Sequence, residues 1–367
     1  MLIRAKTKML FDKFSLTERQ QANTALNLAE LENETVDLKS MPRRLVLELT
    51  NACNLHCIMC GRNTVKFEPT FFDLDWLKKF EPIMHDIEEV SLFGWGEPTV
   101  HPKFVDLLAY LDQYPVRKYF CTNGMRLNSL KKAIFSYHVD IIAVSLDGAK
   151  KETNDSIRCG SSLQRIVGSL RDIVQEKERR KLTWPYINLV FCAMKSNFRE
   201  LPDLVRLAAD IGLEEVKVVY FTAFDKAMVK ESLWNCTDDV AEVFHNAVLL
   251  GDKLHVTLKL PHLQGNDVAG NKFHKDCFVG WRDLFLGSDG YVRPCMSTPE
   301  KFFKFTGDIS FLEIWNHPKY QTFRCQVNHS ALMNHHCQNC YQSSHCNWNK
   351  NESFIQVDHE FAPKWEK

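Results

Sequence analysis

The sequence predicts an α/β fold in which a parallel sheet curls into a partial (β/α)6 TIM-like barrel, followed by a small cysteine-rich domain. Two observations predict it. Between residues 42 and 225, strand-like runs alternate with amphipathic helical runs, and from Cys277 onwards the chain is rich in loops and cysteines. Strands separated by helices pair in parallel through right-handed crossovers, which curl the sheet. Functional residues of such folds collect where strands end and loops begin.

Six strands and five helices are expected in the barrel region. Short runs rich in β-branched and aromatic residues predict the strands Leu45–Thr50, Glu89–Phe93, Lys118–Thr122, Ile141–Leu146, Tyr186–Ala193 and Val216–Phe221. Apolar residues at helical spacing predict the helices Leu74–Met84, Pro102–Leu111, Ser129–Tyr137, Leu163–Lys177 and Phe198–Ile211.

The expected domain organisation has five parts. They are a helical extension (1–41), the barrel (42–225), a bridging segment (226–276), the cysteine-rich domain (277–350) and a tail (351–367). The extension holds a helical run over Leu16–Glu32, opened by the capping-box pattern Ser15-Leu16-Thr17-Glu18. It is too short for a separate peptide-binding domain, although it is long enough to cover one end of a barrel.

Charge and cysteine usage narrow the function classes. Lys+Arg and Asp+Glu both number 46, and this balance favours neither a nucleic acid nor a membrane as partner. The 13 cysteines are an odd number in a chain too large to need disulfides, which predicts free or metal-bound thiols. No signal peptide and no stretch of roughly 18 apolar residues is evident. We therefore expect a reducing, cytoplasmic location.

The first cysteine group follows the first predicted strand. Cys53, Cys57 and Cys60 have the spacing C-x3-C-x2-C. Three thiolates on one loop hold three irons of a [4Fe–4S] cube, whereas electron-transfer clusters use four. One iron would keep a vacant position that a chelating amino acid can occupy. A zinc site that includes His56, or a chance grouping of free thiols, remains an alternative.

Polar residues and glycines mark the ends of the following strands. Taken alone, each is more often a turn or cap residue. In chain order they are Gly94 and Gly96 in Gly94-Trp95-Gly96-Glu97-Pro98, Glu97, Asn123, Ser145, Asp147, Arg158 and Asn197.

Together with the cysteine spacing, this order resembles the radical S-adenosylmethionine (SAM) superfamily over roughly residues 43–225. The resemblance implies that SAM binds the open iron, that Gly94 and Gly96 let the backbone approach SAM, and that Glu97 or its backbone holds the methionine ammonium. It implies further contacts to adenine from Met59, where the family usually has an aromatic residue. Ser145 and Asp147 are suited to hydrogen-bond the SAM ribose, and Arg158, in the loop that follows, to pair with the methionine carboxylate. Asn123 and Asn197 are further SAM-binding candidates by their positions at strand ends.

The second cysteine group resembles the SPASM/Twitch extension of many radical SAM enzymes. Cys277-x12-Gly290-x4-Cys295, a Glu313-Ile314-Trp315 helix and Cys337-x2-Cys340-x5-Cys346 follow its pattern. The full pattern has a further cysteine where this chain has Lys350, so the resemblance implies one auxiliary [4Fe–4S] cluster on Cys277, Cys295, Cys337 and Cys340. Cys346 is then an alternative ligand, a hydrogen-atom donor or an inert thiol, and a zinc ribbon is the competing interpretation.

The resemblance implies reductive cleavage of SAM to a 5′-deoxyadenosyl radical, which abstracts a hydrogen atom from the substrate. Our first expectation is an oxidoreductase or epimerase for a small polar molecule such as an amino sugar or cyclitol. The alternatives are a maturase that crosslinks or otherwise modifies a peptide or protein, and a non-catalytic zinc-stabilised module. An electron donor such as flavodoxin or ferredoxin is the implied partner, besides the small-molecule substrate or peptide.

Overall fold

One large sheet organises the structure, a computed structural model that describes residues 15–64, 68–224, 226–233, 236–261, 263, 277–296, 298, 300–305, 309–329 and 331–338. Its strand order is β12-β11-β10-β1-β3-β4-β5-β7-β8-β9. The strands are β1 (Arg44–Leu47), β3 (Glu89–Leu92), β4 (Arg117–Thr122), β5 (Ile141–Ser145), β7 (Tyr186–Ala193), β8 (Glu215–Tyr220), β9 (Thr257–Lys259), β10 (Asp283–Leu286), β11 (Tyr291–Arg293) and β12 (Phe303–Lys304). No helix in these ranges has the length and apolar character needed to cross a membrane.

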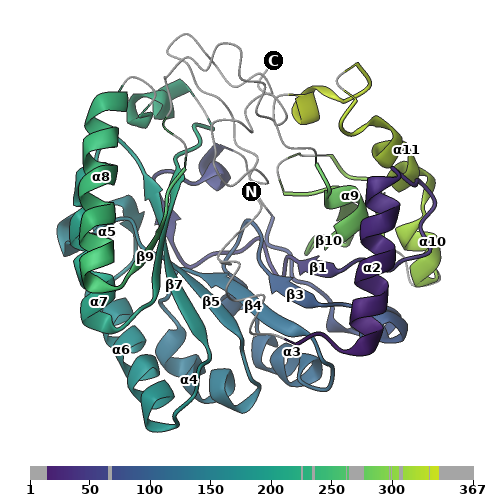
Figure 1. The fold of residues 1–367 in the computed structure, drawn as a ribbon, viewed down its shortest axis with the longest axis horizontal. Coiled ribbons are helices and arrows are strands. Elements are labelled where there is room, and N and C mark those ends of the chain that lie inside the picture. The colour runs from purple at the N-terminus through teal and green to yellow at the C-terminus, as the bar shows by residue number, and fades with distance from the viewer. Residues whose placement is uncertain are drawn as a thin grey trace.

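The six predicted barrel strands are confirmed as β1, β3, β4, β5, β7 and β8. They lie side by side in chain order, and every neighbouring pair is parallel. Strand β9 adds a seventh parallel strand beyond β8, and β10 pairs in parallel with the free side of β1. The sheet therefore forms an open, strongly curved barrel (Figure 1).

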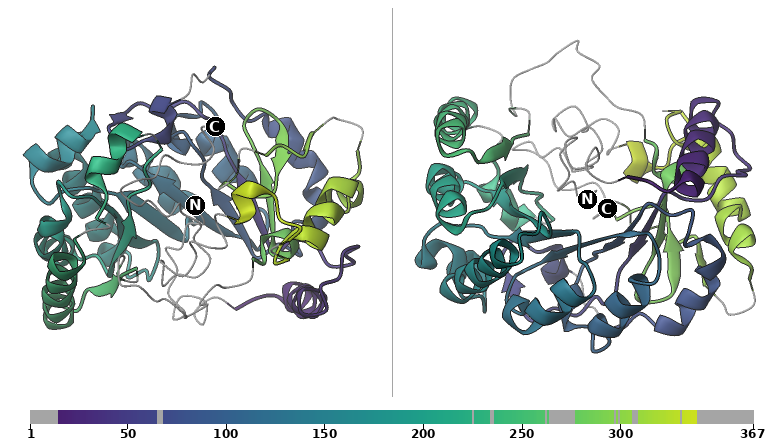
Figure 2. Two further views of the ribbon diagram at one scale, coloured as in Figure 1. Left: turned by 90° about the horizontal axis from the view of Figure 1, so that it is seen from above. Right: turned by 60° about the horizontal axis from the view of Figure 1, so that its bottom comes forward.

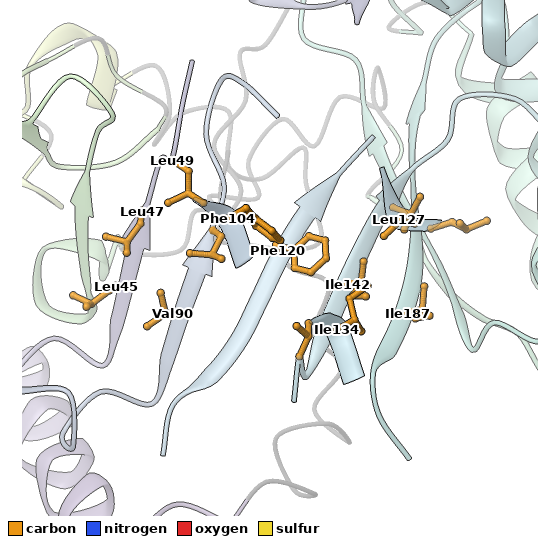
Figure 3. Packing of buried hydrophobic residues seen from close by; sticks show 14 of the residues in the cluster. Leu45, Leu47, Leu49, Val90, Phe104, Phe120, Leu127, Ile134, Ile142 and Ile187 are labelled. Carbon is orange, nitrogen blue, oxygen red and sulfur yellow. The ribbon is translucent and has the colours of Figure 1, made fainter. Parts of the chain in front are cut away.

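Helices cover the convex side of this sheet (Figure 1). They are α3 (Phe104–Leu111), α4 (Leu127–Ser136), α5 (Lys151–Ile157), α6 (Leu163–Arg179), α7 (Leu201–Ile211) and α8 (Thr237–Leu254). Alternate strand residues such as Val90, Phe120 and Ile142 point to these helices and form the main apolar core (Figure 3). Each fully buried side chain of this kind stabilises the fold by about 2 kcal/mol.

The other face of each strand forms the concave side, which we call the inner face. It carries a small separate apolar cluster that includes Tyr119, Ile141 and Ala143. Unlike the helix-covered face, it also carries buried polar side chains such as Asn188 and Glu215. A polar inner face is unusual for a packed core and is typical of a face that receives a ligand.

The C-terminal elements extend the sheet rather than stand apart from it. The hairpin β10–β11 turns at Asp289-Gly290, and Gly290 has the positive φ of 76° that such a turn requires. Helix α9 (Val279–Arg282) precedes the hairpin, and helices α10 (Phe311–Trp315) and α11 (Pro318–Gln326) follow it. Ser310 and Glu313 form a capping box at the start of α10.

The N-terminal helix α2 (Glu18–Glu32) packs against this C-terminal part (Figures 1 and 2). The Asn27 side chain donates to the Trp281 carbonyl at 2.7 Å, and the Trp281 indole donates to the Thr35 carbonyl at 2.7 Å. Arg324 donates to the carbonyls of Val36 and Gly280. The extension thus joins the first and last thirds of the described chain.

Three local expectations are wrong. The predicted helix Leu74–Met84 is two 3-10 helices, η2 (Leu74–Lys79) and η3 (Glu81–Ile83), because Pro82 has no amide N–H to continue an α-helix. The helix α2 is capped by Thr17 with Gln20, not by Ser15 with Glu18. Arg158 and Cys159, expected in loops, form the short strand β6, which pairs with β2 (His56–Cys57).

Candidate functional site

The first cysteine loop lies at the carboxyl end of β1. Cys53, Cys57 and Cys60 are all half-buried free thiols. The loop is held by its own backbone: the Cys60 amide donates to the Cys57 carbonyl at 3.1 Å, and the Leu55 amide donates to Cys53 Sγ at 3.4 Å. Burial raises the pKa of the Cys57 thiol to about 12, against the opposing charge of Arg158. We expect three irons of a cubane on these thiols, because three cysteines on one loop can each bind one iron and binding the metal displaces their protons.

The short sheet β2–β6 ties this loop to the segment that follows β5. Cys57 pairs with Arg158, and the Ile58 amide donates to the Ile157 carbonyl at 2.9 Å. Arg158 Nε lies 2.7 Å from Asp147 Oδ2, and Asp147 is fully buried. The two residues expected to contact SAM are thus brought beside the cysteine loop, where they form an ion pair with each other.

Glu97 joins the ends of β3 and β4. One carboxylate oxygen accepts from the Thr99 hydroxyl at 2.6 Å and the Thr122 hydroxyl at 2.7 Å, and the other accepts from the Asn123 amide at 2.7 Å. The Asn123 side chain then donates to Asn54 Oδ1 at 2.8 Å, within the cysteine loop. This arrangement makes Glu97 a positioning residue that sets Asn123 over the loop.

Gly94 and Gly96 are required by the chain itself. A Cβ on Gly96 would lie 2.3 Å from the carbonyl oxygens of Thr50 and Ala52, and a Cβ on Gly94 would lie 2.3 Å from Glu48 Cγ. The sequence suggested that these glycines make room for a cofactor. In the structure their nearest neighbours are the segment that leads into the cysteine loop.

Glu48 is a residue that the sequence analysis missed. Its side chain accepts from the Trp95 amide at 2.8 Å and from the Ser288 amide and hydroxyl at 3.2 and 3.1 Å. It therefore connects the end of β1 to the glycine loop and to the β10–β11 turn. The sequence could have indicated this residue, because Glu48 is the one acidic residue in the apolar run Leu45-Val46-Leu47-Glu48-Leu49. An unpaired charge at such a position is costly, so a partner for it is expected.

The remaining predicted contacts lie along the same edge of the sheet. Ser145 ends β5, and its hydroxyl lies 3.8 Å from Cys121 Sγ. The Asn197 side chain donates through Nδ2 to the Asp147 and Cys192 carbonyls at 2.9 and 3.0 Å, and so closes the end of β7. Met59 packs against a small apolar cluster that includes Ile157, Met194 and Phe221.

The second cysteine group is described only in part. Cys277, Cys295 and Cys337 are half-buried and pack against the main core. The Cys277 amide donates to Asn328 Oδ1 at 2.6 Å, and the Cys337 amide donates to Asn334 Oδ1 at 2.8 Å. Cys340 and Cys346 lie outside the described residues.

A pocket opens on the inner face between β1, β3, β4 and β10. Its wall includes the fully or nearly buried pair Arg44–Asp283, apolar side chains, and Cys295. The lining residues are Arg44, Val46, Ser91, Phe93, Tyr119, Asp283, Phe285, Pro294, Cys295 and Met296. The pocket is therefore largely apolar, and its wall includes Cys295, which is a predicted ligand of the auxiliary cluster.

Fold and site together define a class: an enzyme with an open parallel barrel, a three-cysteine cluster loop after its first strand, and a C-terminal cysteine module on the same sheet. Models of known protein families match the same two regions of the chain. Residues 47–184 match the radical SAM superfamily, and residues 277–341 match the SPASM iron–sulfur cluster-binding domain. The chain belongs to the radical SAM superfamily and carries a C-terminal SPASM domain. Its cofactors are SAM, a [4Fe–4S] cluster and auxiliary iron–sulfur clusters.

Two curated relatives and one solved structure illustrate the similarity. The chain is 23% identical to the tungsten-containing aldehyde ferredoxin oxidoreductase cofactor-modifying protein of Pyrococcus furiosus, over 76% of this chain and 82% of that protein. It is 27% identical to the mycofactocin maturase MftC of Mycolicibacterium smegmatis, over 75% of this chain and 70% of that protein. Streptococcus suis SuiB bound to precursor peptide SuiA shares the fold, with a TM-score of 0.60 and 16% identity over 88% of this chain and 75% of that one.

Proposed function

We propose that this chain is a radical SAM maturase that modifies a peptide or protein substrate. The observation that carries the proposal is the inner-face pocket with Cys295 in its wall. A side chain that enters this pocket lies beside the auxiliary-cluster module, where an electron can leave a substrate radical. This suits an oxidative change such as a crosslink better than a redox-neutral rearrangement.

The relatives favour one of the two substrate classes expected from the sequence. An amino sugar or cyclitol was our first expectation, and a peptide was the alternative. Similarity to a protein named as a mycofactocin maturase spans three quarters of the chain. The fold shared with SuiB, whose structure holds a precursor peptide, supports the same choice. We therefore place the peptide first.

The residues of the chain have separable tasks in this proposal. Cys53, Cys57 and Cys60 hold the cluster that, with SAM, supplies the hydrogen-abstracting radical. Asp147 and Arg158 lock the loop segment next to these cysteines. The apolar pocket wall orients the substrate side chain and excludes water, which keeps a reactive species from attacking other groups.

The test uses anaerobically reconstituted enzyme, SAM, a reductant and synthetic peptides that correspond to short reading frames next to the gene. We expect 5′-deoxyadenosine in step with loss of two hydrogen atoms from one peptide. Changing Cys53, Cys57 and Cys60 together to alanine abolishes both products. The matched control is Cys325→Ala, because Cys325 is an exposed thiol on α11, and it leaves both unchanged. Unchanged peptides, together with oxidation of an amino sugar, would refute the peptide assignment.

A further inference from the structure

Two buried side chains on the inner face have polar atoms without hydrogen-bond partners. Asn188 in β7 and Glu215 in β8 are both 0% exposed. Within the described structure, neither Oδ1 nor Nδ2 of Asn188 accepts or donates a hydrogen bond, and Glu215 Oε1 accepts none. Buried amide groups are almost always paired, so this arrangement calls for an explanation.

The two side chains are immediate neighbours. Asn188 and Glu215 are register partners on adjacent parallel strands, which lie about 4.8 Å apart. On its other side Asn188 is the register partner of Ala143, which has no polar side-chain atom to pair with the amide. The Tyr186 hydroxyl donates to Glu215 Oε2 at 3.1 Å. This bond holds the carboxyl group in place and leaves Oε1 as the oxygen that can accept a further hydrogen bond.

The pair belongs to the same concave face as the pocket. Ala143 packs in one apolar cluster with Tyr119 and Ile141, and Tyr186 packs against that cluster. Tyr119 is also part of the pocket wall. The inner face thus has a pocket with mostly apolar surface between β1, β3, β4 and β10, and polar side chains on β7 and β8. A peptide residue with an apolar side chain matches both, because its backbone is polar.

We propose that Asn188 and Glu215 bind the extended backbone of the substrate peptide, while one of its side chains occupies the pocket. An extended residue presents its own N–H and C=O on the same side, as in an antiparallel pair. The Asn188 amide matches this with its acceptor Oδ1 and its donor Nδ2. Glu215 Oε1 accepts from a second peptide N–H. This inference rests on the proposed function and names how the substrate is recognised.

The probe is N-acetyl-alanine N-methylamide, which presents one extended residue and a small apolar side chain, with binding to the reconstituted enzyme measured by equilibrium dialysis in the presence of SAM. Its partner probe carries a methyl group on the alanine nitrogen and so lacks the N–H that Asn188 accepts. The protein variants are Asn188→Leu and the isosteric Asn188→Asp. The control is Asn23→Leu, because Asn23 is also buried but donates to the Met41 carbonyl and accepts from the Met41 amide.

We expect Asn188→Leu to weaken binding of the diamide roughly tenfold or more, and Asn188→Asp to weaken it too, while the N-methylated probe binds weakly to every form. Thermal unfolding separates recognition from a structural role. Asn188→Leu leaves the melting temperature unchanged or raised, because it removes unpaired buried groups, whereas Asn23→Leu lowers it and leaves binding unchanged.

Equal affinity of wild type and both Asn188 variants overturns the inference, as does failure of the wild type to bind the diamide. A melting temperature lowered by Asn188→Leu as much as by Asn23→Leu also overturns it, because it shows that Asn188 is paired inside the fold. If peptides are modified normally by the Asn188 variants, this inference fails while the proposed function stands. If no peptide but a sugar is modified, the proposed function itself fails.

Discussion

Replacing Gly96 with alanine tests the geometry of the cluster loop most directly. The new Cβ would stand 2.3 Å from two backbone carbonyl oxygens, those of Thr50 and Ala52. Real Cβ atoms essentially never come closer than 3.0 Å, so the backbone must move by at least 0.7 Å, the difference between 3.0 and 2.3 Å. Neither carbonyl can rotate away as a flexible side chain could, since the Glu97 amide also donates to the Ala52 carbonyl at 2.9 Å.

The expected cost follows from this displacement. Overpacking a well-ordered site lowers the free energy of unfolding by about 3 kcal/mol at the upper end of its usual range. A shift of roughly 1 Å at a reacting site lowers the rate about 100-fold. We therefore expect Gly96→Ala to lose about 3 kcal/mol of stability and about 100-fold in 5′-deoxyadenosine formation.

The assay pairs this variant with Gly168→Ala. Gly168 lies within α6, and a Cβ there would meet no atom within 4 Å, so alanine should stabilise the helix by about 0.5–1 kcal/mol. Urea unfolding, iron content after anaerobic reconstitution and 5′-deoxyadenosine formation are measured for both. Wild-type iron content and activity in Gly96→Ala would refute the close packing described here, and equal losses in both variants would show a general intolerance of alanine.

Three further outcomes are expected. Arg158→Met leaves the buried Asp147 carboxylate without its cation, so the free energy of unfolding in urea should fall by about 3–5 kcal/mol. Adding Asp147→Asn should restore much of this loss. A loss below about 1 kcal/mol would contradict the ion pair. Burial raises the pKa of Glu215 from 4.5 to about 7, so the folded chain holds this proton more tightly than the unfolded chain. Stability relative to Glu215→Gln should then fall by up to about 3 kcal/mol as pH rises from 4.5 to about 7 and stay level above it; parallel curves of stability against pH would contradict this. Thr17→Ala should cost about 1 kcal/mol and Ser15→Ala nothing, since Thr17 is the cap of α2; the reverse result would favour the pattern suggested by the sequence.

The barrel strands were predictable because each is a short apolar run bounded by turn residues, and their parallel order follows from the helices between them. The exceptions have local causes. Pro82 breaks an otherwise helical pattern, and two overlapping capping patterns at Ser15 and Thr17 cannot be ranked without knowing where the helix packs. The pairing of Cys57 with Arg158 joins two residues far apart in the chain, which no local pattern reports.

The sequence marks candidate site residues by spacing and position, but it does not report their contacts. Spacing marked Cys53 and its two partners, and position at strand ends marked Glu97 and Asp147. Their actual neighbours are set by side-chain packing across strands. The Glu97 carboxylate, for example, accepts hydrogen bonds from Thr99, Thr122 and Asn123. Asn188 lies inside β7 and Glu215 begins β8, so a search of the carboxyl ends of the strands passes over both. The assignments of SAM contacts remain predictions.

The pairing of β10 with β1 has a consequence for how the protein is made. Arg44 and Asp283 are partners across this pairing yet lie 239 residues apart in the chain. At synthesis rates of roughly 5–20 residues per second, β1 waits about 12–48 s for β10 to leave the ribosome. During that interval β1 is an edge strand with a free row of amide and carbonyl groups, which favours aggregation. A chain cut before Cys277 keeps that edge for good, so the barrel region expressed alone should be less soluble than the full chain.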